Sequence, residues 1–101
     1  MNNNPWRQIF DCIGEAAALE MLAEEAAELA AAASKAARIL RGENPARMDL
    51  ETAYTHVSDE LRDVENALDV LSAGTDSICT KDPENFKMNR WYQSLFKEES
   101  P

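Results

Sequence analysis

Glycine and proline are scarce in this sequence, with three and four residues among 101. Both residues interrupt helices, so their scarcity favours long helical segments. A surplus of Ala, Glu and Leu points the same way, because these are strong helix formers. The composition therefore predicts an all-α fold, and the length predicts a single domain over residues 1–101.

Cysteine is limited to Cys12 and Cys79, which lie far apart and form no CxxC pair. This excludes a zinc-binding cysteine motif and a disulfide framework, and we expect both thiols to be reduced. The first residues lack a basic region followed by an apolar run, and no segment approaches the ~18 apolar residues of a membrane span. We therefore expect a cytoplasmic protein that is neither secreted nor inserted into a membrane.

Basic side chains are few, with 10 Lys and Arg against 19 Asp and Glu, for a net charge of −9. A general nucleic-acid binder needs a basic surface for phosphates, and an anionic membrane repels an acidic protein. Neither partner is expected. Divalent cations suit this charge better, although a solvated acidic surface accounts for most of it.

The spacing of apolar residues predicts four helices, at 5 to 12 or 13, at 15–41, at 50–72 and at 82–97. Gly42 and Gly74 mark helix ends, and Asp49 is a candidate cap for the third helix. The apolar side of the second helix is predicted to comprise Leu19, Leu22, Ala26, Leu29, Ala33, Ala36 and Leu40. The two long helices are expected to pack antiparallel. Because so short a chain buries a small core, we expect a homodimer or homotetramer to complete it.

Two acidic pairs interrupt the apolar sides of the long helices. On a helical wheel, Glu25 lies between Leu22 and Leu29, and Glu28 lies on the flank of the same stripe. The third helix repeats this arrangement. There, Glu60 lies within the apolar stripe and Asp63 on its flank. We therefore expect four carboxylates to meet between the two helices.

Carboxylates in a core stripe must be neutralised, paired or bound to a cation, because removing an ion from water costs several kcal/mol. Mg²⁺, or alternatively Mn²⁺, prefers oxygen ligands and is often completed by substrate phosphates. A carboxylate-bridged iron site needs Glu-x-x-His motifs, whereas the single histidine, His56, follows Ala53 at that spacing. Either acidic pair alone is more commonly a solvated surface. The two pairs, however, have the same position relative to the apolar stripe of their own helices. This coincidence favours a magnesium site formed by Glu25, Glu28, Glu60 and Asp63.

The stretch 24–28, Glu-Glu-Ala-Ala-Glu, and the stretch 60–63, Glu-Leu-Arg-Asp, resemble the E-E-x-x-E and E-x-x-D signature of the MazG-like, all-α nucleoside triphosphate pyrophosphohydrolases. The similarity extends over residues 15–72 and more weakly over 87–91. It implies a Mg²⁺-dependent enzyme that cleaves a nucleoside triphosphate to the monophosphate and pyrophosphate, as a dimer or a dimer of dimers. It also implies that the four carboxylates named above are the metal ligands.

Five further polar residues are candidates for this chemistry. Glu24 could hold or deprotonate the attacking water, although its place on the helical wheel also suits a solvated side chain. The candidates for substrate binding are Lys35, Asn66, Lys87 and Arg90. Each of these four could equally be an ordinary surface residue. Aromatic residues such as Trp6 and Trp91 could stack on a base, but at helical spacing they more often form core or subunit contacts.

A second hypothesis for function is a non-catalytic helical interaction or regulatory module that retains the fold. It predicts that replacing Glu25 and Glu60 by Gln leaves the response to Mg²⁺ unchanged. The enzyme hypothesis predicts release of pyrophosphate from nucleotides in the presence of Mg²⁺.

Overall fold

A computed structural model describes residues 4–43, 47–78, 81–82 and 84–96. These residues form four helices and no strand, which confirms the all-α prediction. The helices are α1 (Pro5–Ile13), α2 (Glu15–Arg41), α3 (Leu50–Gly74) and α4 (Phe86–Phe96).

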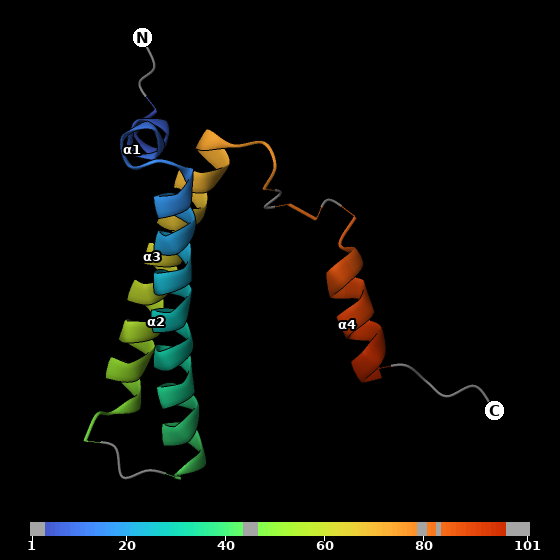
Figure 1. The fold of residues 1–101 in the computed structure, drawn as a ribbon. Helices are drawn as coiled ribbons and strands as arrows, with labels where there is room; N and C mark the ends of the chain where they lie inside the picture. Colours follow the sequence, from blue (N-terminus) through green and yellow to red (C-terminus); the bar gives the residue numbers. More distant parts are fainter. Residues whose placement is uncertain (1–3, 44–46, 79–80, 83, 97–101) are drawn as a thin grey trace, which may run out of the picture.

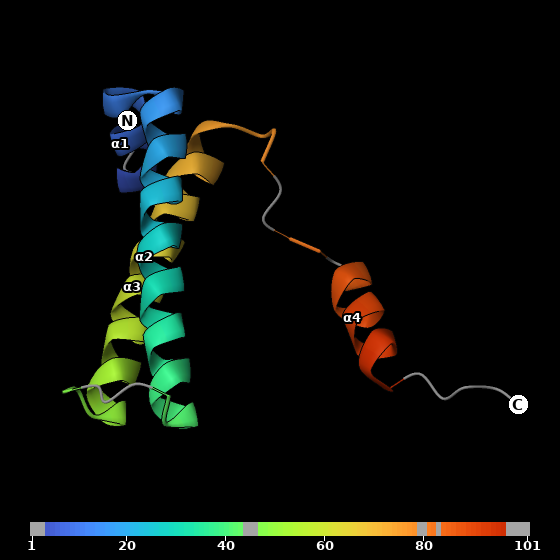
Figure 2. The ribbon, with the colours of Figure 1, turned by 60° about the horizontal axis from the view of Figure 1, so that its bottom comes forward.

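Helices α2 and α3 lie side by side and run antiparallel, forming a long hairpin (Figures 1 and 2). Helix α1 packs across the end of the hairpin where α2 begins and α3 ends (Figure 1). There, the guanidinium of Arg7 donates a hydrogen bond of 3.2 Å to the carbonyl oxygen of Ala73. The last carbonyls of a helix lack partners within it, so this bond satisfies one of them and ties α1 to α3.

The ends of the long helices follow from local side-chain and backbone chemistry. At the start of α3, the Asp49 carboxylate accepts a hydrogen bond of 2.8 Å from the backbone N–H of Thr52, as expected for a cap. Gly42 ends α2 in a left-handed conformation with φ of 68°, which only glycine adopts without strain. Helix α3 extends to Gly74, two residues beyond the predicted end at Ser72.

Gly74 lies under the ring of Phe10, so closely that a Cβ atom there would overlap the ring carbons. Phe10 in turn packs against the buried side chains Ala18, Val70 and Leu71. Glycine at this position thus lets α1 approach the end of α3. The main apolar cluster of the protein lies at this end of the hairpin.

The predicted apolar side of α2 is only partly correct. Leu22 and Leu29 are half-buried and Ala36 is buried, but Leu19, Ala26, Ala33 and Leu40 are exposed. The helix has α3 as its only neighbour along most of its length, and one neighbour covers an arc narrower than the predicted stripe. The residues that face α3 follow a spacing of four and three: Ala18, Leu22, Glu25, Leu29, Ala32, Ala36 and Ile39.

Helix α4 differs from prediction in its start and in its surroundings. It begins at Phe86 instead of at Asp82, whose carboxylate accepts a hydrogen bond of 3.0 Å from the Lys87 N–H. Pro83 and Lys97, which were predicted at its two ends, lie outside the described residues. The helix stands apart from the hairpin, and no residue of α4 contacts α1, α2 or α3 (Figures 1 and 2). None of the described helices combines the length and the apolar character that a membrane crossing requires.

Candidate metal centre

Four carboxylates meet between α2 and α3, and they are the four predicted from sequence. Glu25, Glu28, Glu60 and Asp63 each offer one oxygen, and these oxygens all lie within 4.8 Å of one another. Each pair is separated by three residues, so both of its members project from the same side of their helix. The antiparallel packing of α2 and α3 then brings the two pairs together.

Two of these carboxylates are set into the helix interface. Glu25 and Glu60 are half-buried, and one oxygen of each is shielded from solvent without a hydrogen-bond partner. Glu28 and Asp63 are exposed. Buried polar atoms in proteins almost always have a partner, so two orphaned oxygens at one place favour an absent ligand that carries positive charge.

The surroundings disfavour the charged form of both half-buried acids. Burial raises the pKa of Glu25 above its ordinary value of 4.5, and the negative charges of Glu28 and Asp63 raise it further. Burial also raises the pKa of Glu60, again with contributions from Glu28 and Asp63. Nearby negative charge and low solvent access both raise the free energy of an ionised carboxylate relative to its protonated form. A divalent cation at this point would reverse the penalty.

No basic side chain neutralises the cluster within the described part of the chain. The ion pairs found there join Arg7 to Asp11, Arg41 to Glu43, and Arg62 to Asp59. Arg62 is thus directed away from Glu60, as its place on the helical wheel predicts. Lys35, the nearest basic residue of α2, is exposed and lies two turns beyond Glu28.

The donor set fits a hard divalent cation. Mg²⁺ binds oxygen ligands at roughly 2.1 Å, so two oxygens on one ion are at most about 4.2 Å apart. The observed limit of 4.8 Å requires only a small rotation of side chains, and Glu28 and Asp63 are free to make it because both are exposed. All four ligands are carboxylates, and this set favours Mg²⁺ or Mn²⁺ over softer metals.

A pocket of about 310 Å³ opens beside the carboxylates, between α1 and the hairpin. Its walls comprise Trp6 and Ile9 of α1, Met21 and Glu25 of α2, and Asp63, Asn66, Ala67 and Val70 of α3. The pocket therefore has two acidic side chains at one end and an apolar wall with a single amide, that of Asn66. This combination suits a ligand with a charged part and a flat, largely apolar part.

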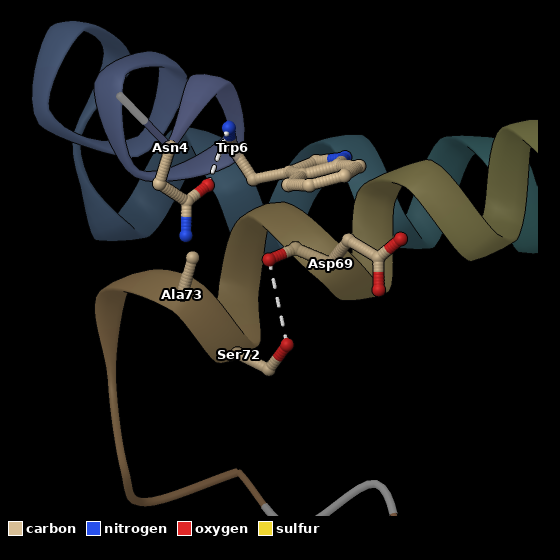
Figure 3. A pocket seen from close by; sticks show the side chains of 5 residues that line it. All are labelled: Asn4, Trp6, Asp69, Ser72 and Ala73. Carbon is tan, nitrogen blue, oxygen red and sulfur yellow. Dashed lines mark hydrogen bonds between the residues drawn. The ribbon is translucent and has the colours of Figure 1, made fainter. Parts of the chain in front are cut away.

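A second pocket, of about 270 Å³, lies between the start of α1 and the end of α3 (Figure 3). Trp6 is the only residue that it shares with the first pocket, and its other walls are Asn4, Asp69, Ser72 and Ala73. The Asn4 side chain caps α1 by accepting from the N–H of Trp6, and the Ser72 hydroxyl donates to the Asp69 carbonyl (Figure 3). With one carboxylate and two polar groups engaged in helix ends, this pocket offers no metal site.

The remaining predicted site residues are placed differently. Asn66 lines the acid-bearing pocket, next to Asp63. Glu24 is exposed and lies outside the group of four carboxylates. Lys87 and Arg90 are on α4, which the structure does not bring to the site. Their role in substrate binding, like that of Lys35, stays a prediction.

Sequence reasoning missed most of the apolar wall. Met21 is one turn before Glu25, and Val70 is one turn after Asn66, so each lies on the site side of its own helix. That spacing was visible in the sequence. The contribution of Ile9 was not, because it depends on how α1 crosses the hairpin.

Comparison of the chain with protein-family models, with curated proteins and with solved structures finds no significant match. The carboxylate cluster and its pocket are therefore the features that indicate what this protein does.

Proposed function

We propose that this protein is a Mg²⁺-dependent nucleoside triphosphate pyrophosphohydrolase. The observation that carries the proposal is the meeting of four carboxylates, two of which have a buried oxygen without a hydrogen-bond partner, beside a largely apolar pocket that Glu25 and Asp63 help to line. The similarity of residues 24–28 and 60–63 to the MazG-like signature supports it. The products would be a nucleoside monophosphate and pyrophosphate, and the biological role would be clearance from the nucleotide pool.

The carboxylates would act by holding the cation between the two helices. Glu25 and Glu60 are fixed by their packing in the interface, whereas Glu28 and Asp63 are exposed and can adjust to the substrate. When bound, the metal supplies positive charge to the triphosphate and lowers the pKa of a coordinated water. In the overall reaction, water forms a new bond to phosphorus, the anhydride bond between the α- and β-phosphates breaks, and pyrophosphate leaves.

The pocket provides a site for the nucleoside. Along α3, Asn66 is one turn beyond Asp63, and Val70 is one turn further, so the apolar wall begins roughly 5–10 Å from the carboxylates. A triphosphate at the acidic end would then place its base against Trp6 and Met21. The Asn66 amide can both donate and accept a hydrogen bond, which suits the polar edge of a base.

Glu24 is the candidate to hold or deprotonate the water. It neighbours Glu25 and is exposed, so it is free to turn toward the cluster. Lys35, Lys87 and Arg90 are the candidates for contacts with phosphate. For the two residues on α4, this requires the helix to approach a hairpin that it does not contact in the structure.

The test is a measurement of pyrophosphate release from a panel of standard and modified ribo- and deoxyribonucleoside triphosphates with Mg²⁺. We expect turnover of at least one nucleotide, abolished by EDTA and by the double substitution Glu25→Gln/Glu60→Gln. The control is Glu20→Gln, which removes one negative charge from an exposed position on α2 and should retain full activity. No turnover of any nucleotide by the folded protein would refute the proposal.

The alternative, a non-catalytic interaction module, is favoured by one observation: the unpartnered, largely apolar helix α4. It requires that the carboxylate cluster have no catalytic role. The two functions separate in the same experiment, because a module shows no nucleotide turnover and no dependence on Glu25 or Glu60.

A further inference from the structure

Helix α4 carries an apolar side that no other described part of the chain covers. Its 11 residues are all exposed, and five large side chains gather on one side of it: Met88, Trp91, Tyr92, Leu95 and Phe96. Their exposed fractions range from 55% to 63%. An isolated helix of this length is marginal in water, so its stability depends on packing of this apolar side.

The hairpin also has an uncovered apolar face. In α2, the residue directly after each α3-facing position belongs to a second row with the same spacing of four and three. Every residue of this row is Leu or Ala. The exposed members are Leu19, Ala23, Ala26, Ala30, Ala33 and Leu40. In α3, the equivalent positions alternate between the apolar residues Tyr54, Leu61 and Leu68, which are exposed or half-buried, and the exposed polar residues Ser58, Glu65 and Ser72. We refer to the six α2 residues and the three apolar α3 residues as the free face.

Both halves of the free face lie on one side of the hairpin. A step of one residue rotates a side chain by about 100° around its helix. Because α2 and α3 run in opposite directions, the residue directly after a contact position points to the same side of the hairpin in both helices. A backward step turns both side chains toward the other side, where Met21, Asp63 and Asn66 line the candidate site beneath α1. The free face is therefore opposite to the site.

We propose that α4 of one copy packs against the free face of a second copy, so that two chains exchange their α4 helices. The shapes are complementary, since a surface rich in alanine leaves grooves that aromatic and leucine side chains can fill. The structure holds α4 apart from its own hairpin, with residues 75–85 between them. In a two-fold exchange, each chain covers the apolar side of α4 and the free face at once.

Charge supports the same pairing. Helix α4 has two basic residues, Lys87 and Arg90, and no acidic one. Helices α2 and α3 together contain eleven Asp and Glu against four Lys and Arg, a net charge of −7. Two hairpins of equal negative charge repel each other, whereas a basic helix is attracted to either.

The surface to be buried is large enough for a stable dimer. The chain exposes 8109 Å², whereas a compact monomer of its mass exposes roughly 5,700 Å². Each aromatic side chain buries about 150–250 Å² when covered. With three aromatic residues on the apolar side of each α4, two exchanged helices reach the class of ~1,600 Å² that is typical of specific interfaces.

The experiment measures the mass of the full chain in solution by light scattering and sedimentation. We expect twice the chain mass of 11.3 kDa. Ala30→Glu on the free face and Trp91→Glu on α4 should each weaken the dimer at least about 30-fold, as substitutions at interface hot spots do. Ala31→Glu and Gln93→Glu add the same charge at positions that lie about 100° or more around their helices from Ala30 and Trp91, and they should leave the dimer intact. All four positions are exposed, and circular dichroism confirms that the helices remain.

Mixing the two disruptive variants distinguishes exchange from other arrangements. The Ala30→Glu copy retains an intact α4, and the Trp91→Glu copy retains an intact free face, so together they can form one of the two contacts. We expect the mixture to yield heterodimers, detected with chains of different isotope mass. The proposal is overturned if the native chain is a monomer, which includes α4 folding onto its own hairpin. It is also overturned if Trp91→Glu leaves the dimer intact, if either control dissociates it, or if the mixture stays monomeric. An α4 helix on the free face would hold Lys87 and Arg90 away from the carboxylates, so the exchange excludes the phosphate contacts suggested for these two residues. Because the free face is remote from the carboxylates, these outcomes are independent of nucleotide turnover.

Discussion

Glu25 of α2 and Glu60 of α3 oppose each other across the helix pair, and each has one buried carboxylate oxygen without a hydrogen-bond partner. Both occupy positions in the four-and-three spacing where the other residues are Ala, Leu, Ile or Val. An apolar pair here would extend the core of the hairpin. The acids instead interrupt it, which is a cost to folding that a bound cation would offset.

The first prediction concerns metal and thermal stability. Without metal, Glu25→Gln/Glu60→Gln should raise the Tm, because it removes two crowded negative charges from the interface. With Mg²⁺, the native protein should melt at a higher temperature, since a ligand that binds only the folded state stabilises it. The double variant should lose this response, whereas Glu20→Gln should retain it. An equal rise in the Tm of the double variant and the native chain would contradict a metal site at these residues.

The second prediction concerns pH. The pKa of Glu25 and of Glu60 is raised in the folded state, so between the ordinary value of 4.5 and the raised value the folded protein holds more protons than the unfolded chain. Stability therefore falls as pH rises through this window in the absence of metal. We expect the Tm of Glu25→Gln/Glu60→Gln, measured relative to the native chain, to increase as pH is raised above 4.5. A Tm difference that is constant with pH would show that these carboxyls titrate alike in both states.

The pKa of Asp49 is shifted in the opposite direction from those of Glu25 and Glu60. Its pKa is lowered from the ordinary value of 3.8, because its carboxylate accepts hydrogen bonds from the side chain and the backbone N–H of Thr52, which stabilise the charged form. The stabilisation by this cap is present above the unfolded pKa and is lost as pH falls through the lowered value. Asp49→Ala should thus lower the free energy of unfolding at neutral pH. In chemical denaturation, this difference should shrink only in strong acid, and a difference that vanishes well above pH 4 would be inconsistent with the cap.

A further prediction concerns the contribution of Trp6 to nucleotide binding in the pocket. Trp6→Ala should raise the KM for the nucleotide roughly 5- to 150-fold, as expected when a stacking contact of ~1–3 kcal/mol is lost. The kcat should change less, because Trp6 contributes to the wall of the pocket and is not one of the four carboxylates. Trp6→Phe should restore much of the affinity, and Cys12→Ala, at an exposed position of the same helix, should have no effect. An unchanged KM for Trp6→Ala would mean that the base binds elsewhere.

The fourth prediction tests how α1 is seated. Gly74→Ala should destabilise the protein by about 1–3 kcal/mol, because the added methyl group displaces the Phe10 ring. Helix propensity alone predicts that Gly74→Ala raises the free energy of unfolding, so a decrease would be specific to the contact with Phe10. In a Phe10→Ala background the cost should disappear, which urea denaturation of the four proteins can measure. Ser72→Ala, at an exposed position of the same helix end, serves as the control.

Much of the local structure was predictable from short-range patterns. The bounds of α1 and α2 follow from Pro5, Gly14 and Gly42, each of which acts on its own neighbours in the chain. The four carboxylates were predictable too, because helical spacing relates each acid to the apolar residues of its own helix. The start of α4 was not, since Asp82 reaches the N–H of Lys87 across five residues instead of capping the residues next to it.

The sequence alone determined that the chain is helical, where its long helices end and which acids interrupt their apolar sides, because these properties depend on neighbours a few residues apart. Only the tertiary structure decided which side of α2 is buried. Ala18 and Leu19 head two adjacent stripes with the same spacing and similar hydrophobicity, yet Ala18 is fully buried and Leu19 is 45% exposed. Hydrophobicity cannot distinguish two such stripes. The position of α3 depends on contacts between distant parts of the chain, and so does the placement of Trp6 and Ile9 by α1 in the pocket that Glu25 and Asp63 also line.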